Sequence, residues 1–165
     1  MDKDNNQPHK GIYRSGMVHT VISDSYITFL IAIILGVIFD SLIPFKIFNN
    51  YLFEYLGLIM IILGSMLTYW AQRSSSIAKK NVLEKGLPIS FEYGPYRYTR
   101  NPSYLGVFIM IMGLGIIFNS IFSIIFGLVS YFIIRFIFLK KEEGLLGNKY
   151  GQVYFDYKNK VKNRL

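Results

Sequence analysis

The chain has 165 residues, of which 52% are hydrophobic and 17% aromatic, and its formal net charge is +8. This composition, with a mean hydropathy of +0.34, exceeds what a soluble core of this size needs and indicates an all-α integral membrane protein. Nucleic acid is not an expected partner, because Lys and Arg flank the apolar runs as they do in cytoplasmic loops. Cysteine is absent, and His9 and His19 both precede the first apolar run, so we expect neither a thiol nucleophile nor a metal site.

The first half of the chain predicts a polar tail and two membrane helices. Residues 1–24 form the tail, which lacks the apolar core of a signal peptide. Within residues 25–70, the runs Tyr26 to Pro44 and Tyr51 to Trp70 are each close to the ~20 apolar residues that a membrane helix needs. Small residues on one face of the second run would let another helix approach closely; they are Gly57, Gly64 and Ser65.

The second half, residues 71–165, begins with a basic segment from Ala71 to Tyr93, which we predict to be a loop. Two further apolar helices follow, about Tyr104 to Phe118 and Ile121 to Leu139. Only two residues separate them, which predicts an antiparallel hairpin. The basic tail after Leu139 is predicted to be an amphipathic segment lying on the surface, with an apolar face made by Tyr150, Tyr154, Tyr157 and Val161.

The distribution of positive charge predicts the orientation. Nearly all Lys and Arg lie in the N-terminal tail, the segment from Arg73 to Arg100 and the C-terminal tail, whereas the two short turns contain only Lys46. Four membrane helices place those three segments on one side, which the positive-inside rule makes cytoplasmic. Both termini and the polar residues that precede the third helix and end the fourth are therefore expected to face the cytosol.

The stretch from Gly94 to Gly106, GPYRYTRNPSYLG, leads from a polar aromatic segment into the third helix, and Glu142 and Glu143 come after the fourth. Together they closely resemble the signature of the isoprenylcysteine carboxyl methyltransferase and phospholipid methyltransferase superfamily. That signature is written G-x-Y-x-x-x-R-H-P-x-Y-x-G, followed later by E-E. The tail also resembles the G-x-x-Y-x-x-Y ending of the family, and the resemblance covers roughly Asn81 to Arg164.

The resemblance implies a membrane methyltransferase that uses S-adenosylmethionine and releases S-adenosylhomocysteine, with residues 71–165 as the catalytic region. It implies contacts between the cofactor and a set of residues near the two motifs, with Glu142 holding the ammonium group. Backbone around Pro88 to Phe91 matches a further contact region. The cofactor-binding set comprises Tyr96, Asn101, Pro102, Ser103, Tyr104, Glu142 and Glu143. The family most often has His where this chain has Asn101, and an amide forms hydrogen bonds but carries no charge.

The residues themselves suit such a ligand. S-adenosylmethionine carries an ammonium, a carboxylate and a sulfonium, so its site needs an acid and hydrogen-bond donors. Glu142 or Glu143 supplies the acid, and Arg100 and the Asn101 amide supply donors. Adjacent helix residues point about 100° apart, so we expect one glutamate to face the site, and the resemblance favours Glu142. The alternatives are a solvated helix end for the glutamates and a headgroup anchor for Arg100.

Arg135 lies within the fourth helix, about one turn before its cytoplasmic end. In carboxyl methyltransferases of the family, an arginine four residues before the first matched glutamate holds the substrate carboxylate, and Phe138 occupies that position here. Arg135 is three residues away and is predicted to bind an anionic group of the acceptor. Alternatively, it extends to the membrane interface. Arg100 and Arg135 are thus the predicted catalytic residues.

We expect an amphiphilic methyl acceptor that enters from the lipid bilayer. The motif lacks a histidine base, which favours a carboxylate of the isoprenylcysteine type, because a carboxylate needs no deprotonation. A phosphatidylethanolamine-type lipid amine is the alternative acceptor. A non-catalytic four-helix membrane protein or small transporter subunit is the alternative of another class, with function at Asp40 and Glu54 and with Glu142 dispensable.

Overall fold

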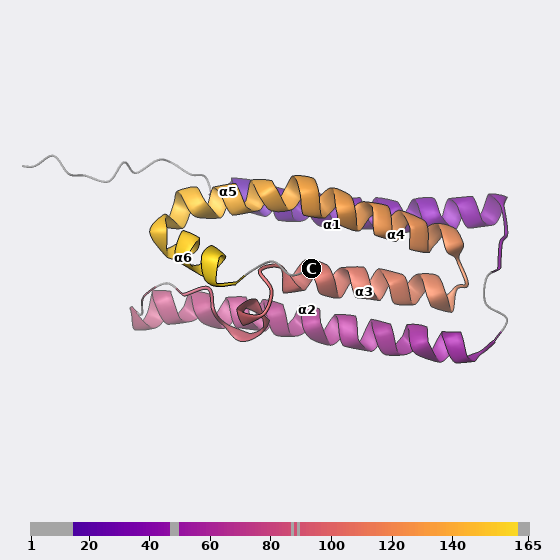
Figure 1. The fold of residues 1–165 in the computed structure, drawn as a ribbon, viewed down its shortest axis with the longest axis horizontal. Helices are drawn as coiled ribbons and strands as arrows, with labels where there is room; N and C mark the ends of the chain where they lie inside the picture. Colours follow the sequence, from indigo (N-terminus) through magenta and orange to yellow (C-terminus); the bar gives the residue numbers. More distant parts are fainter. Residues whose placement is uncertain (1–14, 47–49, 87, 89, 162–165) are drawn as a thin grey trace, which may run out of the picture.

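The computed structural model describes residues 15–46, 50–86, 88 and 90–161, and its regular elements over these residues are all helical. The longer helices lie side by side along one axis, and a short helix folds back at one end (Figure 1). The elements in chain order are α1 (Ser15–Leu42), α2 (Leu52–Lys85), the 3-10 turn η1 (Gly94–Arg97), α3 (Pro102–Ile117), α4 (Ile121–Ile133), the π-helical turn η2 (Ile134–Phe138), α5 (Leu139–Tyr150) and α6 (Gln152–Lys160).

Three helical segments of the described residues are long and apolar enough to cross a membrane: Ser23–Leu42, Leu52–Lys85 and Ile121–Tyr150. Their outward faces carry many large apolar side chains that the protein leaves exposed, such as Leu30 and Leu63. Such faces suit lipid rather than water. The fold is therefore that of a multi-pass membrane protein. The helix predicted over Tyr104 to Phe118 corresponds to α3, a shorter apolar helix of 16 residues.

Helices α2 and α3 pack closely through two pairs of glycines. A Cβ atom placed on Gly64 would lie 2.5 Å from the carbonyl oxygen of Gly106, and one on Gly57 would lie 2.7 Å from that of Gly113. The predicted close approach is thus confirmed at both glycines of α2. Ser65 does not belong to this face, since it is exposed and its hydroxyl donates to the Ile62 carbonyl oxygen at 2.8 Å.

The predicted loop from Ala71 to Tyr93 is wrong over most of its length, because α2 continues without a break to Lys85. Residues 71–85 contain neither glycine nor proline and are rich in helix-forming side chains. The helix ends at Gly86, which adopts the left-handed conformation (φ 61°) and donates its N–H to the Asn81 carbonyl oxygen. The predicted division at residue 70 therefore falls inside a helix.

The N-terminal tail also proves shorter than predicted. Helix α1 begins at Ser15, so the final part of residues 1–24 is helical, whereas residues 1–14 lie outside the described residues. The predicted end of this helix near Pro44 agrees with the observed end at Leu42. Helix α1 packs against α4, η2 and α5, and Phe29 of α1 joins a buried core with Tyr104, Ile111 and Ile134.

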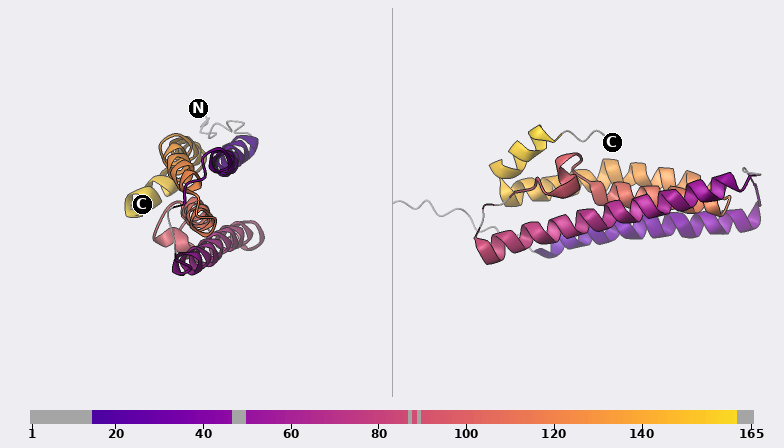
Figure 2. Two further views of the ribbon diagram at one scale, coloured as in Figure 1. Left: turned by 90° about the vertical axis from the view of Figure 1, so that its right-hand side faces the viewer. Right: turned by 90° about the horizontal axis from the view of Figure 1, so that it is seen from below.

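The C-terminal tail does not lie on the surface as predicted. Helix α5 continues the fourth membrane helix to Tyr150, and Gly151 (φ 56°) then reverses the chain into α6. The apolar face of α6 exists, but it packs against the protein's own Phe91. Tyr154 and Tyr157 are 2% and 6% exposed, so the segment is part of the folded structure. Figure 2 shows α6 folded back beside the segment that precedes α3.

Candidate active site

The segment that carries the first motif is held against α2. Gly94 has φ 54°, and a Cβ atom there would meet the side chains of Ser74 and Trp70, so the position requires glycine. Pro95 is buried beside it, and η1 leads to Asn101, whose backbone is neither helical nor extended (φ −136°, ψ 55°). Pro102 then begins α3 in the first helical turn, where proline is tolerated.

The two polar motifs meet at one end of the bundle. The Tyr104 hydroxyl donates to Glu142 Oε2 at 3.0 Å, which joins α3 to α5. Arg100 Nη2 forms an ion pair with Glu143 Oε1 at 3.1 Å, and Lys158 Nζ of α6 pairs with the other oxygen of that carboxylate at 2.8 Å. Residues separated by about forty positions in sequence are therefore direct neighbours.

A cavity, here called the polar cavity, opens between these elements, with an empty volume of about 360 Å³ that includes space open to solvent. Both glutamates line it, although the sequence led us to expect only one. Its lining residues are Phe91, Tyr96, Arg100, Asn101, Glu142, Glu143, Leu146, Tyr154 and Tyr157. Tyr154, Tyr157 and Leu146 were not predicted as site residues. Their regular spacing is visible in the sequence, but it led us to expect contact with the membrane surface.

The polar cavity has hydrogen-bonding capacity that the described residues do not use. Arg100 Nε and Asn101 Nδ2 are buried and have no hydrogen-bond partner there. Glu143 is satisfied by its two cations, whereas Glu142 forms no ion pair among the described residues. Buried donors without partners are rare and unfavourable. The cavity is therefore complementary to a ligand that carries an anionic group and a cationic group.

The tyrosines of the polar cavity are protonated at neutral pH. Burial raises the pKa of Tyr96 above its ordinary value, although a hydrogen bond with Ser103 opposes this effect. Burial also raises the pKa of Tyr154 and of Tyr157. These phenols act as hydrogen-bond donors, as Tyr157 does to the Tyr96 carbonyl oxygen at 2.9 Å.

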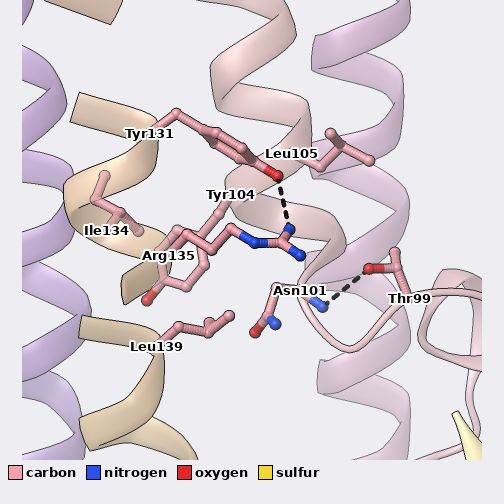
Figure 3. Close-up of a pocket in the computed structure, with 8 residues that line it drawn as sticks. All are labelled: Thr99, Asn101, Tyr104, Leu105, Tyr131, Ile134, Arg135 and Leu139. Carbon is pink, nitrogen blue, oxygen red and sulfur yellow. Dashed lines mark hydrogen bonds between the residues drawn. The ribbon is translucent and has the colours of Figure 1, made fainter. Parts of the chain in front are cut away.

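A second cavity, here called the interhelical cavity, lies between α3 and the helix that runs from α4 to α5. It is lined by Thr99, Asn101, Tyr104, Leu105, Tyr131, Ile134, Arg135 and Leu139 (Figure 3). The Arg135 side chain reaches from η2 toward α3, and its Nη1 donates to the Tyr131 hydroxyl at 3.4 Å. Arg135 has no acidic partner among the described residues. It therefore places an uncompensated cation in a largely apolar space.

Asn101 lines both cavities, and Tyr104 lines the interhelical cavity while bonding to Glu142 of the polar cavity. These two residues thus form the partition between them. Of the remaining predicted residues, Pro102 begins α3 and Ser103 bonds to Tyr96, and neither lines a cavity.

The π-helical turn sets which residues of α5 face the site. Buried positions of this long helix fall at Ser130, Ile134 and Leu139, so one step is five residues long instead of three or four. A π turn accommodates one extra residue and rotates the helix beyond it. As a result, Glu142, Glu143 and Leu146 line the polar cavity.

These features define a multi-pass helical membrane protein with two adjoining cavities that share a wall. The chain belongs to the phospholipid methyltransferase family, whose family model matches residues 52–153, more than half of the sequence. This is a family of the superfamily whose signature the sequence resembles, so the resemblance is confirmed, and the protein is a membrane methyltransferase by family. Helix α1 and most of α6 lie outside the matched region. A comparison with curated proteins found no match.

Proposed function

We propose that the protein is an S-adenosylmethionine-dependent methyltransferase that binds this cofactor in the polar cavity and releases S-adenosylhomocysteine. The observation that carries the proposal is the unused bonding capacity in the wall of that cavity: Arg100 and Asn101, which line it together with Glu142, each have a buried donor without a partner among the described residues. Glu142 suits the ammonium group, and the two donors suit the carboxylate. The aromatic faces of Phe91 and Tyr154 suit the adenine ring.

When bound, S-adenosylmethionine supplies a methyl group activated by its sulfonium sulfur. The protein contributes mainly by holding two ligands in register and by excluding water between them. Tyr96 forms part of the wall around the cofactor, and Ser103 supports Tyr96 without lining the cavity itself. Pro102 fixes the start of α3. Asn101 and Tyr104 lie where the two cavities adjoin, so methyl transfer is proposed to take place beside them.

The interhelical cavity is the proposed acceptor site, and Arg135 is the proposed ligand for an anionic group of the acceptor. Among the described residues that line the two cavities, we find no suitable base. Tyr96 and Tyr154 keep their protons, and position 101 is an amide. Glu143 is engaged by Arg100 and Lys158, and Glu142 is assigned to the ammonium group of the cofactor. A carboxylate needs no base, so we propose an amphiphilic carboxylate of the isoprenylcysteine type.

A phosphatidylethanolamine-type lipid is the second candidate acceptor. The family match favours it, because the matching family is that of the phospholipid methyltransferases. Arg135 would then bind the lipid phosphate, which an arginine binds as readily as a carboxylate.

We also propose that the chain crosses the membrane four times, with α3 as the shortest crossing, and that both cavities face the cytosol. The support is the charge distribution. The C-terminal end of α2, α5 and α6 lie at one end of the bundle, and the turn between α1 and α2 lies at the other (Figure 1). The first group carries Lys79, Lys80, Lys140 and Lys158, whereas the turn contains Lys46. On this view residues 25–70 are chiefly a membrane scaffold, and residues 71–165 carry the chemistry.

The acceptor is tested by a transfer assay with S-adenosylmethionine labelled in its methyl group. Prenylated cysteine analogues, phosphatidylethanolamine and small lipophilic acids are supplied in detergent micelles. Label released by mild base from the carboxylate acceptor supports the ester, whereas base-stable label in phosphatidylethanolamine supports the amine. If none of the acceptors takes up label while the protein remains folded, the proposed acceptors are wrong.

Arg135→Gln should lower methyl transfer at least about tenfold, since a charge-assisted hydrogen bond contributes about 1.5–3 kcal/mol. Arg73→Gln is a matched control, because Arg73 Nη1 also donates to a tyrosine one turn earlier, Tyr69, at 3.4 Å. Arg73 is exposed and lines neither cavity. Full turnover and unchanged acceptor affinity in Arg135→Gln would eliminate its proposed role.

A further inference from the structure

The interhelical cavity contains a second polar group beside Arg135, the hydroxyl group of Tyr131. Arg135 Nη1 donates to this oxygen at 3.4 Å, and Figure 3 shows the contact. Tyr131 comes one turn before Arg135 in the helix that runs from α4 to α5. The next two residues, Phe132 and Ile133, are 52% and 38% exposed, whereas Tyr131 and Arg135 are half-buried and line the cavity. The pair therefore lies beside the lipid-facing surface without belonging to it.

The ring of Tyr131 is held by α3. It stacks on the ring of Phe108, with the ring centroids 4.3 Å apart and the ring planes at 29°. Both rings pack against the buried core of the bundle. A tyrosine side chain has only two rotatable bonds that place its ring, so this stack also fixes the position of the hydroxyl group. Arginine is longer and more flexible, and its guanidinium group is the part that needs to be held.

The hydrogen bond directs the Arg135 guanidinium into the interhelical cavity. A long basic side chain inside a membrane ordinarily extends toward water. The polar cavity, which includes space open to solvent, is lined by residues of α5, and α5 follows Arg135 in the chain. Tyr131 precedes Arg135, so its oxygen attracts the guanidinium in the opposite direction along the helix.

Tyr131 also has a proton of its own to donate. A phenol oxygen that accepts a hydrogen bond keeps its O–H, and the hydrogen bonds of the described residues include no acceptor for the Tyr131 proton. Arg135 has no acidic partner among these residues. A guanidinium and a phenol are therefore side by side in one cavity with donors to spare. An anionic group is complementary to this pair.

We propose that Tyr131 is a second ligand for the anionic group of the methyl acceptor: it holds the Arg135 guanidinium at the interhelical cavity and donates its own O–H to the same anion. This inference rests on the proposed function, whose acceptor site it deepens. The ligand chemistry is one anionic group on an apolar chain, and either a carboxylate or a lipid phosphate can supply it.

The test is calorimetric titration of the detergent-purified full chain in mildly alkaline buffer at a fixed concentration of micelles. The probes are dodecanoate, dodecyl phosphate and dodecanol, which share one alkyl chain and differ in the head group. Tyr131→Phe keeps the ring that stacks on Phe108. It should weaken binding of the anionic probes about tenfold, the effect of losing one hydrogen bond to a charged group. The affinity for dodecanol should not change, because dodecanol has no charge.

Two comparisons show whether the effect is local. Tyr69→Phe is the matched control, because the Tyr69 hydroxyl also accepts from an arginine one turn later, Arg73, at 3.4 Å, yet Tyr69 is exposed and lines neither cavity. It should leave all three affinities unchanged. In an Arg135→Gln background, Tyr131→Phe should weaken anion binding less than it does alone, because the guanidinium that it holds has been replaced.

The two anionic probes distinguish the sources of the anion. A loss confined to dodecanoate supports a carboxylate acceptor, and a loss confined to dodecyl phosphate supports a phospholipid. A loss for both supports a site that takes either anion.

The outcomes also separate this inference from the proposed function, because S-adenosylhomocysteine binding is measured on the same proteins. Tyr131 does not line the polar cavity, so Tyr131→Phe should bind S-adenosylhomocysteine as the wild type does. If the wild type binds it and Tyr131→Phe binds both anionic probes unchanged, the role of Tyr131 is wrong and the function stands. An equal loss for dodecanol, or a full tenfold loss in the Arg135→Gln background, would likewise overturn that role alone. A folded wild-type protein that binds no S-adenosylhomocysteine would overturn the proposed function itself.

Discussion

Glu142 and Glu143 are adjacent in sequence, yet their surroundings give them different tasks. Glu143 holds Arg100 and Lys158 in an ion-paired group that connects the start of α3, α5 and α6. Its side chain is only 13% exposed, so these charges depend on one another for compensation. Glu142 has a neutral partner, Tyr104, and forms no ion pair among the described residues.

At this scale we predict that Glu142→Gln weakens binding of S-adenosylhomocysteine about tenfold or more, since hydrogen bonds to charged groups contribute about 1.5–3 kcal/mol. Glutamine keeps the size of the side chain and still accepts from Tyr104, so the fold should persist. Glu143→Gln should instead lower the melting temperature, because it leaves Arg100 without its carboxylate. Titration calorimetry and thermal unfolding in detergent measure the two effects. An exposed residue of α2, Glu84, provides the control Glu84→Gln. If all three variants had the same affinity for S-adenosylhomocysteine and the same melting temperature, this division of tasks would be wrong.

At the scale of elements, the glycine pairs between α2 and α3 set the position of the whole site. Gly106 belongs to the first motif and lies against Gly64, so the motif is anchored on α2 by direct backbone contact. Helices in lipid gain stability from such close packing rather than from burial of apolar surface. The separation of these two helices therefore controls how far Asn101 and Tyr104 stand from α5.

Gly64→Ala should separate α2 from α3 and destabilise the protein by about 1–3 kcal/mol, the usual cost of overpacking. The measurement is thermal unfolding in detergent. Gly144→Ala is the matched control, because a Cβ atom on that helical glycine would meet no atom within 4 Å. It should be neutral or slightly stabilising, since alanine favours a helix more than glycine does. An equal loss of stability in the two variants would show that the glycine contact is unimportant.

The sequence alone predicts the elements that hydropathy or a motif marks, and it misses the features that depend on packing in three dimensions. Hydropathy locates α1, α3 and α4, and the motifs identify the glutamates and the segment before α3. The length of α2 is missed because the charge of residues 71–85 suggests a loop, although Gly86 and Pro88 mark the stop. The π turn changes no residue pattern and is detectable only in three dimensions. For α6, a periodic apolar face predicts burial but does not specify whether lipid or Phe91 covers it.

At the scale of the whole molecule, the bundle places two cavities side by side. The polar cavity lies between α5, α6 and the segment before α3, and the interhelical cavity lies deeper between α3 and the helix opposite it. Asn101 belongs to both. An ionic cofactor from water and an amphiphile from lipid would therefore meet across one residue, which is the arrangement that the proposed reaction requires.

The proposed orientation predicts which parts of the chain a membrane-impermeant thiol reagent reaches in intact cells. The chain has no cysteine, so all labelling of a variant comes from the one cysteine that was introduced. The wild-type protein serves as the unlabelled control. Lys46→Cys, in the turn after α1, should be labelled from outside the cell. Lys80→Cys, in α2, should be labelled only after the membrane is permeabilised. The opposite pattern would place the cavities outside the cytosol.

The most direct test of the central claim is calorimetric titration of the detergent-purified wild-type protein with S-adenosylhomocysteine. The account predicts saturable binding at one site per chain, weakened both by Asn101→Ala at the start of α3 and by Glu142→Gln in α5. Binding that neither substitution affects, or no binding by a protein that thermal unfolding shows to be folded, would contradict it.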